Sequence, residues 1–506
     1  MSRRGRPKLA TLVKDFDNLR AGIEGEQRIL QKLASSEANQ SNYLADWYKF
    51  SQESGSVYPS QGLLLTPYDY LEVKAKYLLP SSELLDTLRM RRYLLELFNH
   101  PYRIANLDKI NRKKFVAPKV VKGVAISEAI KKGQALAIGD MAASVVGEKK
   151  ERISRTARYA NGPFVKLGRQ ARCVFVGSSS PDVWNSAAAV ATMAASHCLA
   201  LIPRNGLTSA TGRQADLASE VFEWLDKMAE QILEGRSDKK KILKYWKGNV
   251  MATIEADPKK AVERASILYE RGVRSFRVYS PEPGTGPTKT VLALREKFKD
   301  SIEIFAGQVV SVTQAEELVE AGVDGIYVGI GGGGRCITGV RSGSVIDWPE
   351  LVWKMRGRVG VPVVVEGGAS DHVAVTLLLG ATGIATSRVV SGGTIESPGG
   401  AMYCVDNDGK LFKPYGGEAS ARTKYLDGKM LAFGIPAFVE GETTKAMKSY
   451  VKFVYPTLTY NLHLLLEDSI LALVFRGVES VEKLHSLNPS PLRLLTASGE
   501  FQRGTH

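Results

Sequence analysis

A glycine-rich stretch that ends in a cysteine is the part of this sequence best suited to chemistry. Five of the six residues from 329 to 334 are glycine, and Arg335, Cys336 and Thr338 follow. Glycine at this density makes sense where the backbone needs positive φ angles or where a ligand approaches it closely. Backbone amides and an arginine beside a cysteine favour the nucleophilic thiolate. We therefore predict a catalytic Cys336 thiol, with a flexible loop around a buried cysteine as the alternative.

Two further segments, each at the end of an apolar run, are typical of phosphate sites. Glu366-Gly367-Gly368-Ala369-Ser370 follows one run, and Ser387 follows the next. Paired glycines before a helix expose backbone amides at its N-terminus, where anions bind. These positions predict a phosphate site, with two tight turns that hold no ligand as the alternative.

The elements that must position these segments alternate regularly from residue 172 onward. Short apolar runs, typical of buried parallel strands, are separated by helical patterns such as Ala261–Arg271, Thr288–Phe298 and Thr313–Ala321. This predicts an α/β fold, a (β/α)8 TIM barrel with its site at the carboxyl ends of the strands. An open, doubly wound sheet is the alternative. The predicted strands are Cys173–Val176, Leu199–Ile202, Val250–Ile254, Ser275–Tyr279, Ile302–Ala306, Gly325–Val328, Val361–Val365 and Gly383–Ala385.

Two other parts flank the predicted barrel, which we place at residues 171–400. Residues 1–170 predict a mainly helical N-terminal extension, with helical periodicity over Leu12–Leu33 and Leu84–Phe98. Residues 401–506 predict a C-terminal flap and a helical appendage, with a helix over Leu462–Phe475 and coil after Asn488. A connection from 205 to 248, longer than usual in a barrel, holds a helix over Asp216–Leu233 and a basic run.

Composition excludes several classes of protein. The 506 residues are 44% hydrophobic and 24% charged, a balance that excludes collagen-like and wholly disordered chains. No uninterrupted apolar run reaches the roughly 18 residues of a membrane span. The four dispersed cysteines form neither a disulfide framework nor a zinc site. We therefore expect a cytoplasmic protein with no membrane partner.

The net charge of +15 is concentrated in the N-terminal third of the chain. Residues 1–170 hold 30 basic and 17 acidic side chains, a surplus of 13, so an anionic ligand of the barrel does not explain it. Arg3-Arg4-Gly5-Arg6-Pro7-Lys8 resembles an AT-hook, which binds the minor groove of A·T-rich DNA. A motif this short arises readily by chance, so we expect no nucleic-acid partner unless one binds through Arg3–Lys8.

Taken in order, the strand-end segments resemble the inosine-monophosphate dehydrogenase and guanosine-monophosphate reductase family over residues 172–450. The glycine-rich loop with Cys336-Ile337-Thr338 is the most specific match, and weaker matches precede and follow it in the family's order. These are Ala306-Gly307-Gln308-Val309-Val310-Ser311, Gly322-Val323-Asp324-Gly325, Glu366-Gly367-Gly368, Gly380-Ala381, Ser397-Pro398-Gly399 and Tyr415-Gly416-Gly417-Glu418-Ala419-Ser420.

The resemblance implies an oxidoreductase that acts on a purine nucleoside monophosphate. The Cys336 thiolate would attack C2 of the purine, and hydride would pass to or from a nicotinamide. Thr338 would position the water or ammonia that resolves the thioimidate, and Glu440 resembles the glutamate that activates ammonia in the reductases. We interpret the reaction as oxidation of IMP to XMP with NAD, because Cys-Ile-Thr is the dehydrogenase-like motif. NADPH-dependent deamination of GMP to IMP is the close alternative, and a nucleotide-binding protein without redox activity is the third.

The resemblance also assigns residues that bind the ligands. Glu366 would hold the ribose hydroxyls, and Gly417 and Glu418 would also lie around the nucleotide. The phosphate would be held by Gly334, Gly367, Gly368, Ser387 and Tyr415. Those around the cofactor would be Tyr279, Ser280, Gly329 and Gly331. A homotetramer and a potassium ion are also implied, the ion held by backbone carbonyls of Gly331, Gly333 and Cys336.

The sequence departs from the family at four of these positions. The ribose-binding aspartate is replaced by Glu366, and the serine two residues before the cysteine by Gly334. The aspartate that contacts the cofactor is replaced by Tyr279, and a methionine near the purine by Glu418. The link after the second strand is too short for the tandem nucleotide-sensing module of many dehydrogenases. The Arg-Tyr pair of their flap has no firm counterpart, although Arg422 and Lys424-Tyr425 lie nearby.

Overall fold

The computed structural model describes the chain between residues 76 and 504, with gaps. The described residues are 76–79, 81–134, 136, 138–143, 153–280, 284–329, 336–387, 392–405, 410–427, 439–441, 443–447 and 456–504. Several predictions therefore lie outside the described residues, namely the AT-hook-like stretch Arg3–Lys8, the helix over Leu12–Leu33 and the loop glycines Gly331, Gly333 and Gly334.

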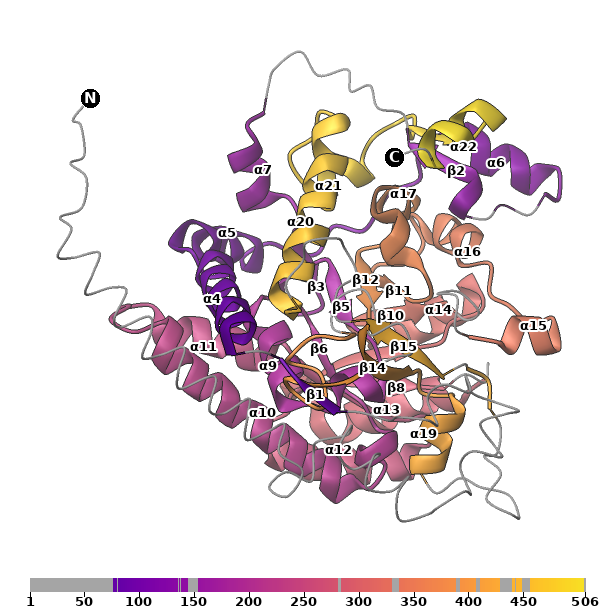
Figure 1. The fold of residues 1–506 in the computed structure, drawn as a ribbon. Coiled ribbons are helices and arrows are strands. Elements are labelled where there is room, and N and C mark those ends of the chain that lie inside the picture. Colours follow the sequence, from indigo (N-terminus) through magenta and orange to yellow (C-terminus); the bar gives the residue numbers. More distant parts are fainter. Residues whose placement is uncertain are drawn as a thin grey trace, which may run out of the picture.

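Eight parallel strands form the barrel that the sequence predicts (Figure 1). Their order is β5-β12-β11-β10-β9-β8-β7-β6, and a parallel bridge between Val176 and Leu199 joins the two ends of the sheet. The open-sheet alternative is therefore wrong. The strands are β5 (Phe175–Gly177), β6 (Ala200–Ile202), β7 (Val250–Glu255), β8 (Ser275–Tyr279), β9 (Glu303–Gly307), β10 (Gly325–Val328), β11 (Val363–Val365) and β12 (Gly383–Thr386).

Helices cover the outside of the barrel (Figure 1). Four of them begin at a Ser or Asp whose side chain accepts a hydrogen bond from an N–H of the first turn, which is the preferred helix N-cap. Two short helices, α8 (Pro181–Trp184) and α15 (Thr338–Ser342), begin near strand ends. The outer helices are α9 (Ala187–Ala195), α10 (Thr211–Ile232), α11 (Lys239–Gly248), α12 (Pro258–Glu270), α13 (Gly286–Phe298), α14 (Val312–Glu320), α16 (Trp348–Met355) and α17 (Val373–Leu379).

The long connection between the second and third strands is helical throughout most of its length. Its predicted helix is α10, and the basic run after it is α11, which buries Ile242 and Trp246 while its lysines stay near solvent. The two helices lie side by side and pack on each other (Figure 1). The basic run is therefore the outer face of an amphipathic helix.

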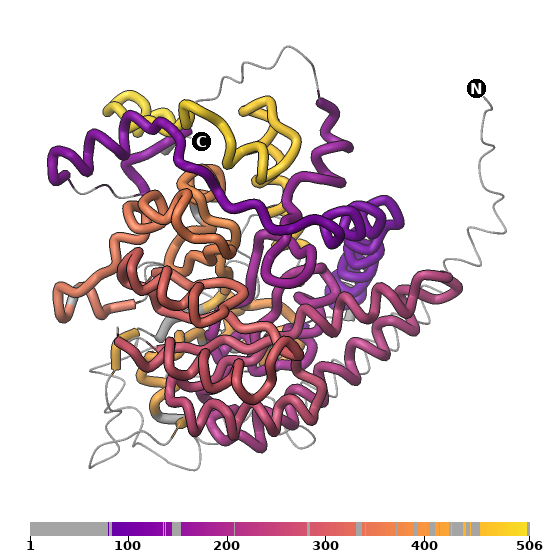
Figure 2. Tube along the Cα trace, turned by 180° about the vertical axis from the view of Figure 1, so that it is seen from behind, coloured from indigo at the N-terminus to yellow at the C-terminus, as the bar shows by residue number. Residues whose placement is uncertain are grey.

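The N-terminal extension is mainly helical in the part that the structure describes. Its helices are α4 (Ser81–Phe98), α5 (Pro101–Asn111), α6 (Val124–Lys131) and α7 (Arg155–Asn161), and short strands β1 (Lys76–Leu78) and β2 (Met141–Ala143) accompany them. Residues 114–123 cross the outside of the barrel as an extended segment (Figure 2), where Arg356 Nε donates to the carbonyl of Lys119 at 2.9 Å.

The C-terminal part pairs with the N-terminal extension at two places. Strand β1 joins an antiparallel sheet with β13 (Met402–Val405), β14 (Leu411–Gly416) and β15 (Thr443–Met447). The prediction of coil after Asn488 is wrong, because β16 (Leu492–Leu494) pairs with β2 and α22 (Ala497–Gly504) follows. Strand β16 is held by a partner far away in the chain, which a local pattern does not reveal. The boundaries at 170 and 400 stay predictions.

Helix α20 (Leu458–Phe475) is long and apolar enough to cross a membrane, by length and composition alone. More than half of it is buried, and it packs on α4, α7, α9 and α17. A core helix that is apolar nearly all round has this composition. We therefore interpret α20 as a helix packed against the side of the barrel, together with α21 (Val481–His485).

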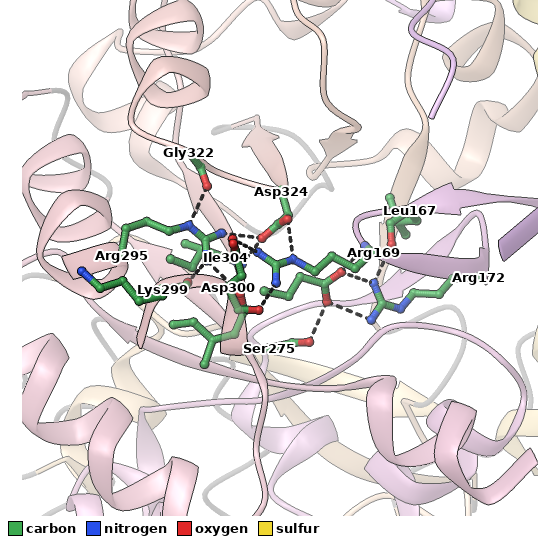
Figure 3. A network of polar contacts seen from close by, with 12 residues as sticks. Leu167, Arg169, Arg172, Ser275, Arg295, Lys299, Asp300, Ile304, Gly322 and Asp324 are labelled. Carbon is green, nitrogen blue, oxygen red and sulfur yellow. Dashed lines mark hydrogen bonds and ion pairs between the residues drawn. The ribbon is translucent and has the colours of Figure 1, made fainter. Parts of the chain in front are cut away.

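The amino-terminal end of the barrel is closed by the hairpin of β3 (Phe164–Leu167) and β4 (Gln170–Cys173). Arg172 of this hairpin forms a bidentate pair with Glu303 at the start of β9, both distances being 2.8 Å, and Ser275 Oγ donates to the same carboxylate at 2.6 Å (Figure 3). Burial raises the pKa of Glu303, but Arg172 and Ser275 more than offset this and the pKa is lowered. An ion pair and hydrogen bonds on Glu303 thus stabilise this end of the barrel. The candidate site lies at the opposite, carboxyl end of the strands.

Candidate active site at the carboxyl ends of the strands

Cys336 follows β10 in the chain, after residues 330–335, which lie outside the described part of the structure. It is half-buried, and its Sγ donates to Thr338 Oγ1 at 3.3 Å at the start of α15. The loop begins at Gly329, whose φ is +126° and whose Cβ, if it had one, would overlap the carbonyl of Glu366. Glycine is therefore required here, because the loop begins in contact with the backbone that follows the neighbouring strand β11.

One segment from the C-terminal part lies against the cysteine, and a second segment lies against the first. Cys336 forms an antiparallel bridge with Gly441, and the N–H of Ile337 donates to the carbonyl of Glu440 at 2.9 Å. The N–H of Glu440 in turn donates to the carbonyl of Ala419 at 2.9 Å. The backbone of Glu440 is thus fixed between the cysteine and the segment after β14. Its side chain is exposed.

The predicted phosphate residues that the structure describes gather at the ends of β11, β12 and β14. Gly367 and Gly368 have φ angles of +88° and +80°, and a helical turn begins directly after them. Tyr415 OH donates to Ser387 Oγ at 3.1 Å. Left-handed glycines before a helical start expose backbone N–H groups. Gly367, Gly368 and Ser387 therefore follow the adjacent strands β11 and β12, and Tyr415 of the separate antiparallel sheet is bonded to Ser387.

Glu366 is paired with an arginine that the sequence reading missed. Arg277 of β8 is fully buried and donates to both oxygens of Glu366, at 3.0 Å and 2.5 Å. Arg277 also donates to Ser179 Oγ at 2.7 Å, and Gln308 Nε2 donates to Glu366 at 2.8 Å. Burial by itself lowers the pKa of Arg277. Glu366, together with the Tyr327 and Tyr279 phenols, raises it by more, so the pKa lies above its usual value. A single charge in the middle of an apolar strand was the signal available in the sequence.

A cavity of about 370 Å³ opens beside this pair at the ends of β6, β7 and β8. Arg204 crosses it, with its guanidinium 5.7 Å from the ring centre of Tyr279 and its Nε 3.6 Å from Glu418. Burial and the charge of Glu418 raise the pKa of Tyr279, so the phenol stays neutral. The lining residues are Arg204, Asn205, Ser209, Glu255, Arg264, Tyr279, Glu418, Ala419, Lys424 and Glu440.

The predicted cofactor residues divide between two places. Tyr279 lines the cavity, and Ser280 follows it, with its backbone bonded to Gly307 and Gln308. Gly329 lies instead against Glu366 and is not among the lining residues. Gly417 lies near the cavity, and its carbonyl accepts from Thr423 Oγ1 at 2.9 Å.

Arg422, which the sequence places near the position of the dehydrogenase flap's Arg-Tyr pair, is buried in the structure. Its Nε donates to both oxygens of Asp182 on α8, at 2.9 Å and 3.1 Å, and both side chains are about 1% exposed. Burial raises the pKa of Asp182 to about 6, although Arg422 acts in the opposite direction. Arg422 therefore ties α19 (Ala421–Leu426) to the first strand end, while Lys424 lines the cavity.

The other candidate side chains are structural. His197 is buried with its Nε2 2.8 Å from Asn99 Oδ1, and Cys173 and Cys198 are both buried. Burial, together with Cys173, holds the pKa of Cys198 well above its usual value, so this thiol stays protonated. Among the described residues no group of three or more His, Cys, Asp or Glu side chains converges as a metal site.

The fold defines a class, the (β/α)8 barrels, and here a cysteine and a pair of left-handed glycines follow two of its neighbouring strands. The model of the IMP dehydrogenase / GMP reductase domain matches residues 123–490, which is most of the chain. This chain belongs to that family.

Several curated relatives are similar over part of their length. Inosine-5'-monophosphate dehydrogenase 1 of Arabidopsis thaliana is 31% identical over 191 residues, 36% of each chain. The enzyme of Nitrosopumilus maritimus (strain SCM1) is 36% identical over 136 residues, 26% of this chain and 28% of the relative. That of Cryptosporidium parvum is 29% identical over 194 residues, 35% of this chain and 48% of the relative. The matches thus span about half or less of these relatives.

Proposed function

We propose that this chain is a purine-nucleotide oxidoreductase that oxidises IMP to XMP with NAD through a covalent bond to Cys336. The observation that carries the proposal is that the Cys336 thiol, bonded to Thr338, and the left-handed glycines Gly367 and Gly368 follow neighbouring strands of one parallel barrel, at whose carboxyl end sites lie. Family membership supports the same class of reaction.

The chain's own residues account for binding and for the covalent step. The phosphate binds at Gly367, Gly368, Ser387 and Tyr415, which directs the purine toward β10. Sγ of Cys336 loses its proton and bonds to C2 of the base, and C2 then gives up its hydrogen as hydride. Water adds to C2 of the resulting thioimidate, the C–S bond breaks, and XMP leaves with the thiol regenerated. Thr338, which already accepts from Sγ, positions that water.

The cavity beside Tyr279 is chemically suited to a nicotinamide dinucleotide, which supplies hydride acceptance when bound. Arg204 and Lys424 are cations on its wall, and Tyr279 offers an aromatic ring. Arg204 Nε is buried and makes no hydrogen bond among the described residues, so a ligand atom would satisfy it. Two carboxylates of the wall, Glu255 and Glu418, favour hydroxyl groups of a ribose over additional phosphates.

A related reaction, reduction of GMP to IMP by NADPH with release of ammonia from C2, is a second candidate that two observations favour. The glutamate whose family counterpart activates ammonia, Glu440, has its backbone fixed beside Cys336. Arg422, the nearest candidate for the arginine of the dehydrogenase flap, is committed to Asp182. Both proposed reactions form a bond between Cys336 and C2 of the purine. They differ in what resolves this adduct, which is water in the oxidation of IMP and hydride in the reduction of GMP.

Cofactor absorbance separates the candidates. The full chain is mixed with IMP and NAD, and in parallel with GMP and NADPH, and absorbance is followed at 340 nm, the nicotinamide band. We expect absorbance to rise in the first mixture, and a fall in the second would establish the reductase. Silence in both, with nucleotide still bound, would overturn the redox proposal in favour of a binding protein.

The variant Cys336→Ala tests the nucleophile. We expect it to lose turnover and to lose the nucleotide adduct that mass spectrometry detects on the Cys336 peptide. The matched control is Cys198→Ala, a buried cysteine outside the site, which should keep turnover. Full turnover by Cys336→Ala would refute the covalent mechanism.

We also propose a cytoplasmic homotetramer with a potassium ion at the cysteine loop. The family resemblance supports both, and the carbonyls assigned to the ion come from Gly331, Gly333 and Cys336. Light scattering on the purified chain measures the assembly, and replacing potassium by sodium in the assay measures the ion's effect on turnover.

A further inference from the structure

The carboxylate of Glu366 has little hydrogen-bonding capacity left for a sugar. A carboxylate has about four acceptor positions. Arg277 takes one on each oxygen, at 3.0 Å on Oε1 and 2.5 Å on Oε2, and Gln308 Nε2 takes a second on Oε2 at 2.8 Å. Counted over the described residues, one acceptor position therefore remains, on Oε1. Glu366 is 17% exposed, so a ligand can reach that position.

Arg277 is held in place by more than the carboxylate. Its side chain is buried, its Nη1 also donates to Ser179 Oγ at 2.7 Å, and its guanidinium lies 4.0 Å from the ring centre of Tyr327 and 4.6 Å from that of Tyr279. Moving it away would leave a charged guanidinium and a carboxylate without partners in the interior, which is strongly unfavourable. The pair is therefore expected to persist when a nucleotide binds.

A ribose and a 2'-deoxyribose make different demands on such a carboxylate. The two neighbouring hydroxyls of a ribose donate two hydrogen bonds and need two free acceptor positions. A 2'-deoxyribose has one hydroxyl in this region and needs only one. Since one position is free on Glu366, the second hydroxyl of a ribose finds no acceptor there.

We infer that the nucleotide site does not select for the ribose diol, and that purine 2'-deoxyribonucleoside monophosphates bind about as well as the ribonucleotides. This inference rests on the proposed function, since it takes Glu366 to face the sugar of a nucleoside monophosphate. Arg277 and Gln308 are positioning residues here, because they act through Glu366.

Calorimetric titration of the full chain with IMP and with 2'-deoxy-IMP tests the inference. We expect the two dissociation constants to agree within about threefold, because a hydrogen bond to a charged group corresponds to tenfold or more in affinity. A preference for IMP of tenfold or more would overturn the inference and leave the proposed function standing. If neither nucleotide binds, the proposed function falls and the inference with it.

Variants that remove a donor from the Glu366 carboxylate provide a second test. Arg277→Met frees one acceptor position on each oxygen of Glu366, and we expect IMP to bind at least tenfold more tightly than 2'-deoxy-IMP in this variant. Gln308→Leu frees one position on Oε2 without leaving a buried charge unpaired, and it should move the ratio in the same direction if Arg277→Met does not fold. Arg204→Met is the matched control, since Arg204 also lies over the Tyr279 ring but does not touch Glu366, and its ratio should not change. An unchanged ratio in every folded variant would contradict the inference.

Discussion

The N–H of Ile337 donates to the carbonyl of Glu440 at 2.9 Å, across about a hundred residues of sequence. This bond fixes a glutamate backbone one residue from the cysteine that we assign as the nucleophile. The neighbouring bridge between Cys336 and Gly441 makes the contact a short piece of antiparallel pairing. A polar side chain at position 440 is thereby available to the cavity beside Tyr279, and its role is directly testable.

Glu440→Gln distinguishes the two reaction directions. If Glu440 activates ammonia, GMP reduction should fall by about 100-fold or more, the usual contribution of a general acid or base. IMP oxidation should change by less than about threefold. Steady-state kinetics of both reactions measure this, with Glu263→Gln, an exposed glutamate of α12 outside the cavity, as the control. Equal loss in both directions would show that Glu440 acts on a step common to both.

Gly329→Ala should lower turnover, because it displaces the cysteine loop, more than it lowers the free energy of unfolding. Alanine is strained at φ +126°, and its Cβ would collide with the carbonyl of Glu366. We expect turnover to fall at least tenfold, because a displacement of about 1 Å at a reacting atom has effects of this size or larger. The control is Gly360→Ala, where a Cβ would meet no atom within 4 Å. Unchanged turnover in Gly329→Ala would show that the loop tolerates a different exit from β10.

Arg172→Met should destabilise the amino-terminal end of the barrel. The change leaves the buried carboxylate of Glu303 without its bidentate partner, and such losses reduce the free energy of unfolding by about 3–5 kcal/mol. Denaturant unfolding measures the effect. The double variant Arg172→Met, Glu303→Leu removes both charges and should recover most of the loss. A double variant as unstable as the single one would show that the pair is not the cause.

Acid should destabilise the fold through His197. Burial, with Arg103 and Arg236, lowers the pKa of His197 to about 3. The folded state keeps this ring neutral, whereas the unfolded chain binds a proton below about pH 6.5. The free energy of unfolding therefore falls as the pH drops from about 6.5 to about 3, by at most about 1.4 kcal/mol per pH unit.

The measurement for His197 is denaturant unfolding at several pH values between 4.5 and 7. His197→Asn removes the titrating ring and suits the positive φ of +60° at this position, so its stability should depend less on pH. His100→Asn, at an exposed histidine that caps α5, should keep the full dependence. The same slope in His197→Asn as in the unaltered chain would assign the acid sensitivity to other groups.

The barrel could be predicted from the sequence because its strands and helices follow local patterns of apolar residues. Apolar runs such as Ser275–Tyr279 and Gly325–Val328 mark buried parallel strands, and the observed strands begin and end within two residues of the predicted ones. The carboxyl end of each strand is then known, so Cys336, Gly367 and Ser387 fall at one end of the barrel.

Tertiary structure alone decided which distant groups meet. The Arg277–Glu366 pair joins the ends of two strands that are not neighbours. Glu440 is bonded to Ile337, next to Cys336, and β16 is a strand because β2 lies beside it. Hydrophobic periodicity specifies which face of an element is buried, but it carries no information about the polar partner on another element. The chemistry of Glu366, a carboxylate neutralised by a buried guanidinium, therefore follows from the closed barrel and not from the motif that contains it.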